Sequence, residues 1–336
     1  MKRFIRFCLL LCLPIILMFI FYIAIDPFKV VRHYDVYYTT DNFVGLNRGF
    51  VSAKHYNNHY YEYNYNSFIF GNSRSIAYYV EEWEKYIPKE SVCYHFDANG
   101  GSVGETYYQI KFINEHGNIN NALLIFDLDL LGRTEMQGIL FSCPPFIKEN
   151  KSLLSFYHQY FVSFYDFEFF YAFLDYSIHK KYKPYMGFSI NNPERAMEYN
   201  PIINELNWNN QEEIIGKGLY YTSERIDGFN NAQFTDTVSK SVLNEERKEL
   251  LKGIKSIFDI QNTNYRIIIS PIYNQVKINP ADLQYLYDVF GKEYVFDFSG
   301  PNKWTSDYHN YYETSHYRPC VANEIMEIVY KNEIQN

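Results

Sequence analysis

The stretch SFIFGNSRS, residues 67–75, decides the fold of this chain. Its first four residues form an apolar run of the length of a buried strand, and Gly71 ends that run. Residues 76–87 follow with the apolar spacing of a helix and stop at Pro88. The polar residues at 72–75 therefore lie between a strand and a helix. In open α/β sheets, ligands bind at this edge.

The same alternation of strand and helix recurs along the chain. It predicts further strands at 92–96, 122–126, 265–270 and 294–298, and helices at 76–87, 105–115, 238–260, after Pro280 and from Pro319 to about Tyr330. This order predicts a three-layer α/β/α domain with a central parallel sheet over residues 67–332. The alternation pauses at 141–235, where a helix-like aromatic stretch, 153–182, and a loop-rich remainder predict an insertion. We expect the tyrosine-rich segment 26–66 to form an ordered collar at the domain edge.

The N-terminus predicts a membrane anchor. Lys2, Arg3 and Arg6 precede an uncharged run at residues 7–25 that is nearly long enough to span a bilayer as a helix. The early positive charges predict a cytoplasmic tip at 1–6, a transmembrane helix at 7–25 and an extracytoplasmic body, which is periplasmic if the source is Gram-negative. A cleaved signal peptide is the alternative, although the bulky residues at 21–27 offer no small-residue cleavage site.

Composition excludes several classes of protein. The net charge of −8 and the absence of a lysine/arginine tract argue against a nucleic-acid partner, and 47% hydrophobic residues exclude a disordered chain. Cys93, Cys143 and Cys320 allow at most one disulfide in the body. No histidine/cysteine cluster has zinc-site spacing and no nucleotide loop is present, so we expect no metal site and no cofactor. Aromatic residues make up 20% of the chain and concentrate at 34–66 and in the insertion, where we expect glycan selectivity.

A serine and a histidine far apart in the chain are candidates for nucleophilic chemistry. Ser73 follows the first strand, and its backbone N–H at a helix N-terminus would favour a developing oxyanion. The ordinary alternative is that Ser73 or Ser75 only caps that helix. In the loop ETSHY, residues 313–317, His316 could take the proton of Ser73 and Glu313 could orient the imidazole.

Two further observations leave the assignment of the base open. Asp307 and His309 form a rival acid–histidine pair close to the same loop. His316 could also simply pack against the C-terminal helix.

Taken together, the Gly-x-Ser motif after the first strand, the glycine-bearing turn after the second and the acid-x-x-His before the last helix resemble the SGNH (GDSL-like) hydrolase superfamily. They are most similar to its membrane-anchored branch, which includes the alginate O-acetylation and DltD-type envelope acylation proteins. The resemblance covers about residues 67–332 without the insertion. It implies that Ser73 is the nucleophile, His316 the general base and Glu313 its carboxylate. It also implies that the backbone N–H groups of Ser73 and of Gly101 (or Gly100) form the oxyanion hole.

The chain departs from the family pattern at three places. Asn72 and Glu313 each replace an aspartate of the family, with little effect on the implied roles. The third strand is followed by Asp127 and Asp129 where the family has an asparagine that completes the oxyanion hole. A carboxylate would repel an oxyanion unless Asp129 points away, and loss of one donor costs about 10²–10³ in rate. Asn274, after the fourth strand, is a further candidate for the cleft.

We therefore predict an extracytoplasmic esterase or O-acyltransferase that acts on acyl, most simply acetyl, esters of an envelope or exported polysaccharide. The expected partners are the glycan substrate, the membrane through the N-terminal helix and a membrane acyl-transfer protein. The alternative is a catalytically impaired SGNH-fold component that binds or assembles a polysaccharide export or modification machine. Asp127 and Asp129 motivate this alternative.

Overall fold

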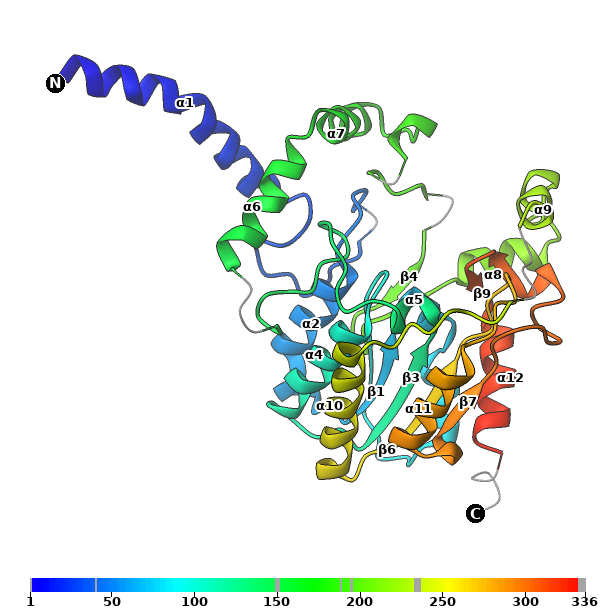
Figure 1. Cartoon of the computed structure of the whole chain (residues 1–336). Helices are drawn as coiled ribbons and strands as arrows, with labels where there is room; N and C mark the ends of the chain where they lie inside the picture. The colour runs from blue at the N-terminus through cyan, green and yellow to red at the C-terminus, as the bar shows by residue number, and fades with distance from the viewer. Residues whose placement is uncertain are drawn as a thin grey trace.

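The computed structural model describes residues 2–39, 41–148, 152–187, 189–193, 196–232 and 237–331, with side chains described from residue 11 onward. Its centre is a five-stranded parallel sheet (Figure 1). The strands are β1 (Ser67–Gly71), β2 (Cys93–Asp97), β3 (Asn121–Phe126), β6 (Asn264–Ile269) and β7 (Val295–Asp297), in the order β2-β1-β3-β6-β7. The prediction of a central parallel sheet is confirmed. The strand order places a topological switch point between β1 and β3.

Helices cover both faces of the sheet. One core cluster lies under α2 (Arg48–Tyr63), α4 (Val103–Asn114), α10 (Glu245–Gln261) and α11 (Pro280–Phe290). A second lies under η1 (Ser73–Ala77), α3 (Val80–Trp83) and α12 (Pro319–Val329). Along β1, Phe68 and Phe70 enter the first cluster and Ile69 enters the second, because successive strand residues point to opposite faces. Figure 1 shows α2, α4 and α10 grouped on one side of the sheet and α12 on the other.

Two predicted helices differ from the structure. The helix expected at 76–87 is replaced by η1, α3 and η2 (Glu84–Tyr86). It is interrupted because Tyr78 is extended and Val80 starts a new helix by donating its N–H to the carboxylate of Glu205, 125 residues away. The helix expected from residue 238 begins only at α10, where the Asn244 side chain caps it. Val238 instead bridges to Lys277 in extended conformation.

The second half of the lead-in at 26–66 is the helix α2. It contacts the edge strand β2 and places Ala53 and Tyr56 in the first core cluster. The sequence pattern did not predict this helix, because its buried face mixes apolar residues with Arg48, Ser52 and His55. Tyr56, for example, has ring contacts with Phe68 and Tyr94 of the sheet.

A buried arginine ties α2 to the sheet. Arg48 is fully buried, and its Nη2 lies 2.6 Å from Oδ1 of Asp97 at the end of β2. Its Nη1 donates to Oδ1 of Asn204 at 2.9 Å, and its guanidinium faces the rings of Tyr38 and Tyr199. One cation therefore joins the lead-in, the sheet and the insertion.

The insertion has two parts. The first contains α6 (Leu153–Phe164) and α7 (Phe167–His179), so the predicted helical stretch is confirmed but interrupted at residues 165–166. These helices pack on the end of α1 (Lys2–Ile25) and on residues 28–51 in a third aromatic cluster. The second part contains β4 (Glu198–Asn200), β5 (Glu205–Asn207), α8 (Asn209–Gly216) and α9 (Ser223–Asn230). The remaining short elements are α5 (Leu128–Leu131), η3 (Pro184–Met186), η5 (Lys292–Tyr294), η6 (Tyr308–Asn310), β8 (Tyr311–Glu313) and β9 (His316–Tyr317).

Within the described residues, no helix is both long enough and apolar enough to cross a membrane. The expected tip at 1–6 and the first residues of the expected anchor at 7–25 lie among those whose side chains are not described. The transmembrane anchor therefore stays a prediction. Of the cysteines in the described part, Cys12, Cys93 and Cys320 are free thiols.

Candidate active site

Ser73 lies at the carboxyl edge of the sheet, directly after β1. The Asn72 side chain accepts the Arg74 N–H at 3.0 Å, which turns the chain from the strand into η1 with Ser73 as its first residue. Gly71 permits the turn, because a Cβ at this position would lie 2.9 Å from the carbonyl oxygen of Ile125 in β3. The serine therefore lies at the switch point between β1 and β3, where open α/β sheets bind ligands.

A tight hairpin brings Glu313 and His316 together. Strands β8 and β9 pair antiparallel across the two-residue turn 314–315, with Glu313 opposite His316. One carboxylate oxygen of Glu313 bonds to Nδ1 of His316, and the other accepts the Ser315 N–H at 2.8 Å. The acid-x-x-His spacing therefore corresponds to a hairpin, which places the Glu313 carboxylate within hydrogen-bonding distance of the His316 ring.

The hairpin delivers His316 to Ser73 across 243 residues of sequence. Its Nε2 lies 2.8 Å from Oγ of Ser73. Burial raises the pKa of Glu313, but the hydrogen bond and charge of His316 outweigh burial, so this pKa is lowered from its ordinary value. An ionised Glu313 holds a proton on Nδ1 and leaves Nε2 free to accept the Ser73 proton. The three side chains have the connectivity of a nucleophile, its base and the group that orients the base.

The rival pair does not reach a serine nucleophile. Asp307 and His309 bond to each other at 2.7 Å, and both side chains are more than half exposed. The ring of His309 packs on Tyr221 and Tyr308. Among the described residues, His316 is the histidine that bonds to Ser73.

Arg74 pairs with Asp127 and Asp129, the two aspartates that follow the third strand. Its Nη1 lies 2.8 Å from Asp127 and its Nη2 3.1 Å from Asp129, while its Nε donates to the carbonyl oxygen of Ser315 at 3.1 Å. Asp127 also accepts from the Asn72 side chain at 2.6 Å. Asp129 is thus directed at a cation, and Arg74 joins the nucleophile turn, the third-strand loop and the histidine hairpin.

The expected oxyanion donors are only partly available. The Gly101 N–H donates to the carbonyl of Ala98 at 3.1 Å, so in this structure it closes a turn and is occupied. Gly100 has a left-handed φ of +58°, and within the described residues its N–H and that of Ser73 have no acceptor. The Ala98 N–H donates to the carbonyl of Gly71 at 3.1 Å, which holds this turn beside the end of β1.

Asn274 lies in a local turn after β6. It is exposed, and its side chain accepts the N–H of Val276 in a local turn. Its place after a neighbouring strand suggested the cleft, but the turn directs the side chain back to its own backbone.

Four residues beside the site, Trp208, Glu212, Tyr312 and Arg318, come from pairings that the sequence pattern did not reveal. The ring of Trp208 lies 6.2 Å from that of His316 and 4.9 Å from that of Tyr312. Glu212 in α8 accepts from the Tyr312 hydroxyl at 2.6 Å and from Arg318 Nε at 2.9 Å, so the insertion is held against the histidine hairpin. Of these, Trp208 could have been found from the sequence, as a tryptophan in a loop-rich segment.

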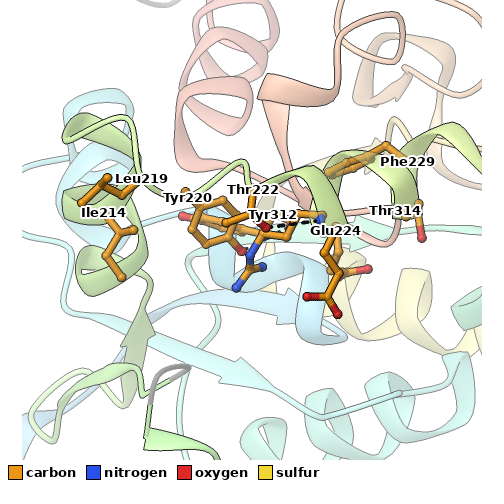
Figure 2. Close-up of a pocket in the computed structure, with 11 residues that line it drawn as sticks. Ile214, Leu219, Tyr220, Thr222, Glu224, Phe229, Tyr312 and Thr314 are labelled. Carbon is orange, nitrogen blue, oxygen red and sulfur yellow. Dashed lines mark hydrogen bonds between the residues drawn. The ribbon is translucent and has the colours of Figure 1, made fainter.

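A cavity of about 610 Å³ adjoins the triad on the side of Glu313 (Figure 2). It lies between α8, α9 and the β8 strand, and its lining combines aromatic rings with charged groups. Tyr220, Phe229 and Tyr312 supply the rings, and the Arg225 guanidinium lies 4.0 Å from the centre of the Tyr220 ring. A volume of this size suits a small ligand.

A second serine–histidine–glutamate set is buried beneath the site. The Ser75 hydroxyl donates to the carbonyl of Asn72 at 2.8 Å, and Nε2 of His95 lies 3.0 Å from the same hydroxyl. Glu205 accepts the N–H of Val80 at 2.6 Å. Ser75 and His95 have no exposed surface, so this set supports the nucleophile turn and is closed to substrate.

This buried set predicts a stability that depends on pH. Burial raises the pKa of Glu205 to about 7. Between its ordinary value of 4.5 and about 7, the folded state holds a proton that the unfolded state releases, so stability falls as pH rises through this window. Glu205→Gln keeps an acceptor for Val80 without the buried charge. We expect this variant to be more stable than the wild type by on the order of 1–3 kcal/mol at pH 8, with the advantage gone near pH 4.

Denaturant unfolding of both proteins at the two pH values measures this difference. His95, whose pKa burial lowers to about 4, is common to both and largely cancels in the comparison. An equal offset at both pH values would contradict the prediction.

Comparison of the chain with protein-family models, with curated proteins and with solved structures gives no match in any of the three. The described residues also contain no group of three or more histidine, cysteine, aspartate or glutamate side chains placed to hold a metal ion.

Proposed function

We propose that this chain is a serine esterase or O-acyltransferase with an SGNH-like active site. The observation that carries the proposal is the 2.8 Å contact between Ser73 Oγ and His316 Nε2, with Glu313 bonded to the other nitrogen of the ring. A histidine that only packed against the C-terminal helix would not need to place Nε2 against Ser73. The serine is the first residue of a helix at the switch point of the sheet, where ligands bind.

The proposed reaction has two halves. Ser73 Oγ attacks the acyl carbon while His316 takes its proton, and the N–H groups of Ser73 and Gly100 stabilise the oxyanion. The ester C–O bond then breaks, and His316 returns the proton to the leaving alcohol. In the second half, water or a glycan hydroxyl gives its proton to His316 and attacks the acyl carbon; the bond from that carbon to Ser73 Oγ then breaks, and His316 returns the proton to Oγ. Water makes the protein an esterase, and a glycan hydroxyl makes it a transferase.

We further propose acyl esters, most simply acetyl esters, of an envelope or exported polysaccharide as the substrate. The support is the cavity beside Glu313, whose lining combines buried tyrosine and phenylalanine rings with the charged side chains of Glu224 and Arg225. An extracytoplasmic body anchored through α1, with a membrane acyl-transfer protein as partner, belongs to the same proposal. Its support is the placement of Lys2, Arg3 and Arg6 ahead of an uncharged run.

A fluorophosphonate probe tests the active-site proposal, because it reacts only with an activated serine hydroxyl. We expect labelling of the wild-type chain, located at Ser73 by peptide mapping, and none of Ser73→Ala. Ser155→Ala, a change at an exposed serine of α6, is the matched control and should label like the wild type.

Folded wild-type protein that neither reacts with the probe nor hydrolyses p-nitrophenyl acetate would contradict the enzyme. That outcome would favour the binding or assembly component instead. The occupied N–H of Gly101 is the observation on its side.

A further inference from the structure

The surface around α1 is apolar on every side. Consecutive residues from Leu11 to Phe21 are exposed, among them Leu11 at 62%, Ile15 at 61% and Ile20 at 56%. Consecutive positions of a helix point in directions about 100° apart, so this exposure surrounds the helix rather than forming one stripe. A protein groove covers a stripe, whereas a helix that is apolar all round needs an apolar medium.

Helix α6 continues this apolar surface onto the folded domain. Its inner face packs on α1, with Phe161 beside Phe19 and Phe164 beside Tyr22. The helix contains no acidic or basic residue except His158. On its outer face, Leu154 is 82% exposed and Leu153 and Val162 are also exposed, together with the uncharged polar residues Ser155 and Gln159 and with His158.

Helix α7 carries a second outward stripe. Phe167, Tyr171, Leu174 and Ile178 are exposed and follow the i, i+4, i+7, i+11 spacing of one helix face. The opposite face, with Phe169, Ala172 and Phe173, is already buried in the third cluster. The helix is therefore apolar on its solvent side as well as on its inner side, which is unusual for a surface helix of a soluble domain.

The charges bordering this surface suit a bilayer. Exposed Lys180 and Lys181 follow α7, and Arg32 caps α1 by donating to the carbonyls of Ala24 and Ile25. Tyrosines and cations at the edge of an apolar surface are typical of the membrane–water interface. The acidic residues of α7 are Glu168, in its first turn, and Asp175, which is buried and paired with Lys183.

We propose that α6 and α7 form a lipid-facing surface that lies in the interface of the bilayer holding α1. This inference rests on the proposed membrane placement of α1. Figure 1 shows α1, α6 and α7 on the side of the molecule to which the carboxyl ends of the strands point. The same contact would hold the Ser73 edge of the sheet toward the membrane surface, so substrate would be met close to the bilayer.

Tryptophan substitution tests this surface in the full chain. Leu154→Trp and Phe167→Trp each place a fluorophore at an 82% exposed position, and Ile260→Trp places one at a 74% exposed position of α10 as the control. The probe is a vesicle of phosphatidylcholine and phosphatidylglycerol with or without brominated acyl chains. We expect brominated lipid to reduce the added emission at 154 and 167 at least about twofold and to leave that at 260 unchanged, because an interfacial helix buries its apolar face among the acyl chains.

The outcomes separate this inference from the placement of α1. If the chain does not float with the vesicles, the anchor itself is wrong. If it floats but brominated lipid quenches none of the added tryptophans, α1 binds lipid and the α6–α7 surface does not. If the emission at 154 and 167 is blue-shifted without vesicles and is not quenched by lipid, a second copy of the chain covers this surface and the inference is overturned.

Discussion

Replacing His316 by alanine is expected to lower kcat/KM for an acyl ester by at least about 10³-fold, because within the described residues His316 is the base bonded to the Ser73 hydroxyl. Nε2 of His316 lies 2.8 Å from the serine hydroxyl, and Glu313 holds the ring in the tautomer that leaves this nitrogen unprotonated. Turnover of p-nitrophenyl acetate by the purified full chain is the measurement.

The chain supplies a matched control for this change. His309 lies seven residues before His316 and is also bonded to a nearby carboxylate, that of Asp307. Unlike His316, it is not bonded to Ser73 among the described residues. We expect His309→Ala to leave kcat/KM within about twofold. Equal losses in the two variants would show that the effect comes from the loop and not from the base.

Arg48→Met is expected to destabilise the chain by about 3–5 kcal/mol, since it leaves the Asp97 carboxylate buried without its cation. Both side chains are fully buried, and the arginine also donates to Asn204. Methionine keeps much of the volume, so lost packing alone costs less. For a domain of this size, such a change lowers Tm by on the order of 10 °C.

A second variant separates charge from packing. In the double variant Arg48→Met, Asp97→Asn, the uncompensated charge is gone, so we expect part of the lost stability to return. Thermal unfolding followed by circular dichroism measures both variants. A single variant within about 1 kcal/mol of the wild type would contradict the view that the Arg48–Asp97 pair holds α2 against the sheet.

The predicted and observed folds agree where local pattern is strong. Strands β1 and β3 are short apolar runs bounded by turn residues, and their burial on both faces removes the need for any polar alternation. The helix α2 was missed because its buried face mixes apolar residues with Arg48, Ser52 and His55, which gives no clear apolar stripe in the sequence. The start of α3 was missed because Glu205 from a distant segment supplies its first hydrogen bond.

In the candidate site, too, some features could be predicted from the sequence and others could not. The proximity of Glu313 and His316 could be predicted, because a two-residue turn brings such neighbours together. The orientation of Asp129 could not, since it depends on Arg74 of another strand-end loop. The occupation of the Gly101 N–H was also hidden, because it depends on the exact turn taken after β2.

The aromatic insertion was expected to select a glycan, and the structure separates its two halves. Residues 153–179 pack on α1 in a cluster of their own, whereas Trp208 and Tyr220 reach the site. Sequence alone determined the parallel sheet, the serine at its edge and the acid–histidine pair, because each follows from spacing along a few residues. Tertiary structure alone decided which histidine meets Ser73 and which aromatics lie beside His316 and the cavity. Both depend on side chains that lie far apart in the sequence and meet only when the sheet, the hairpin and the insertion pack together.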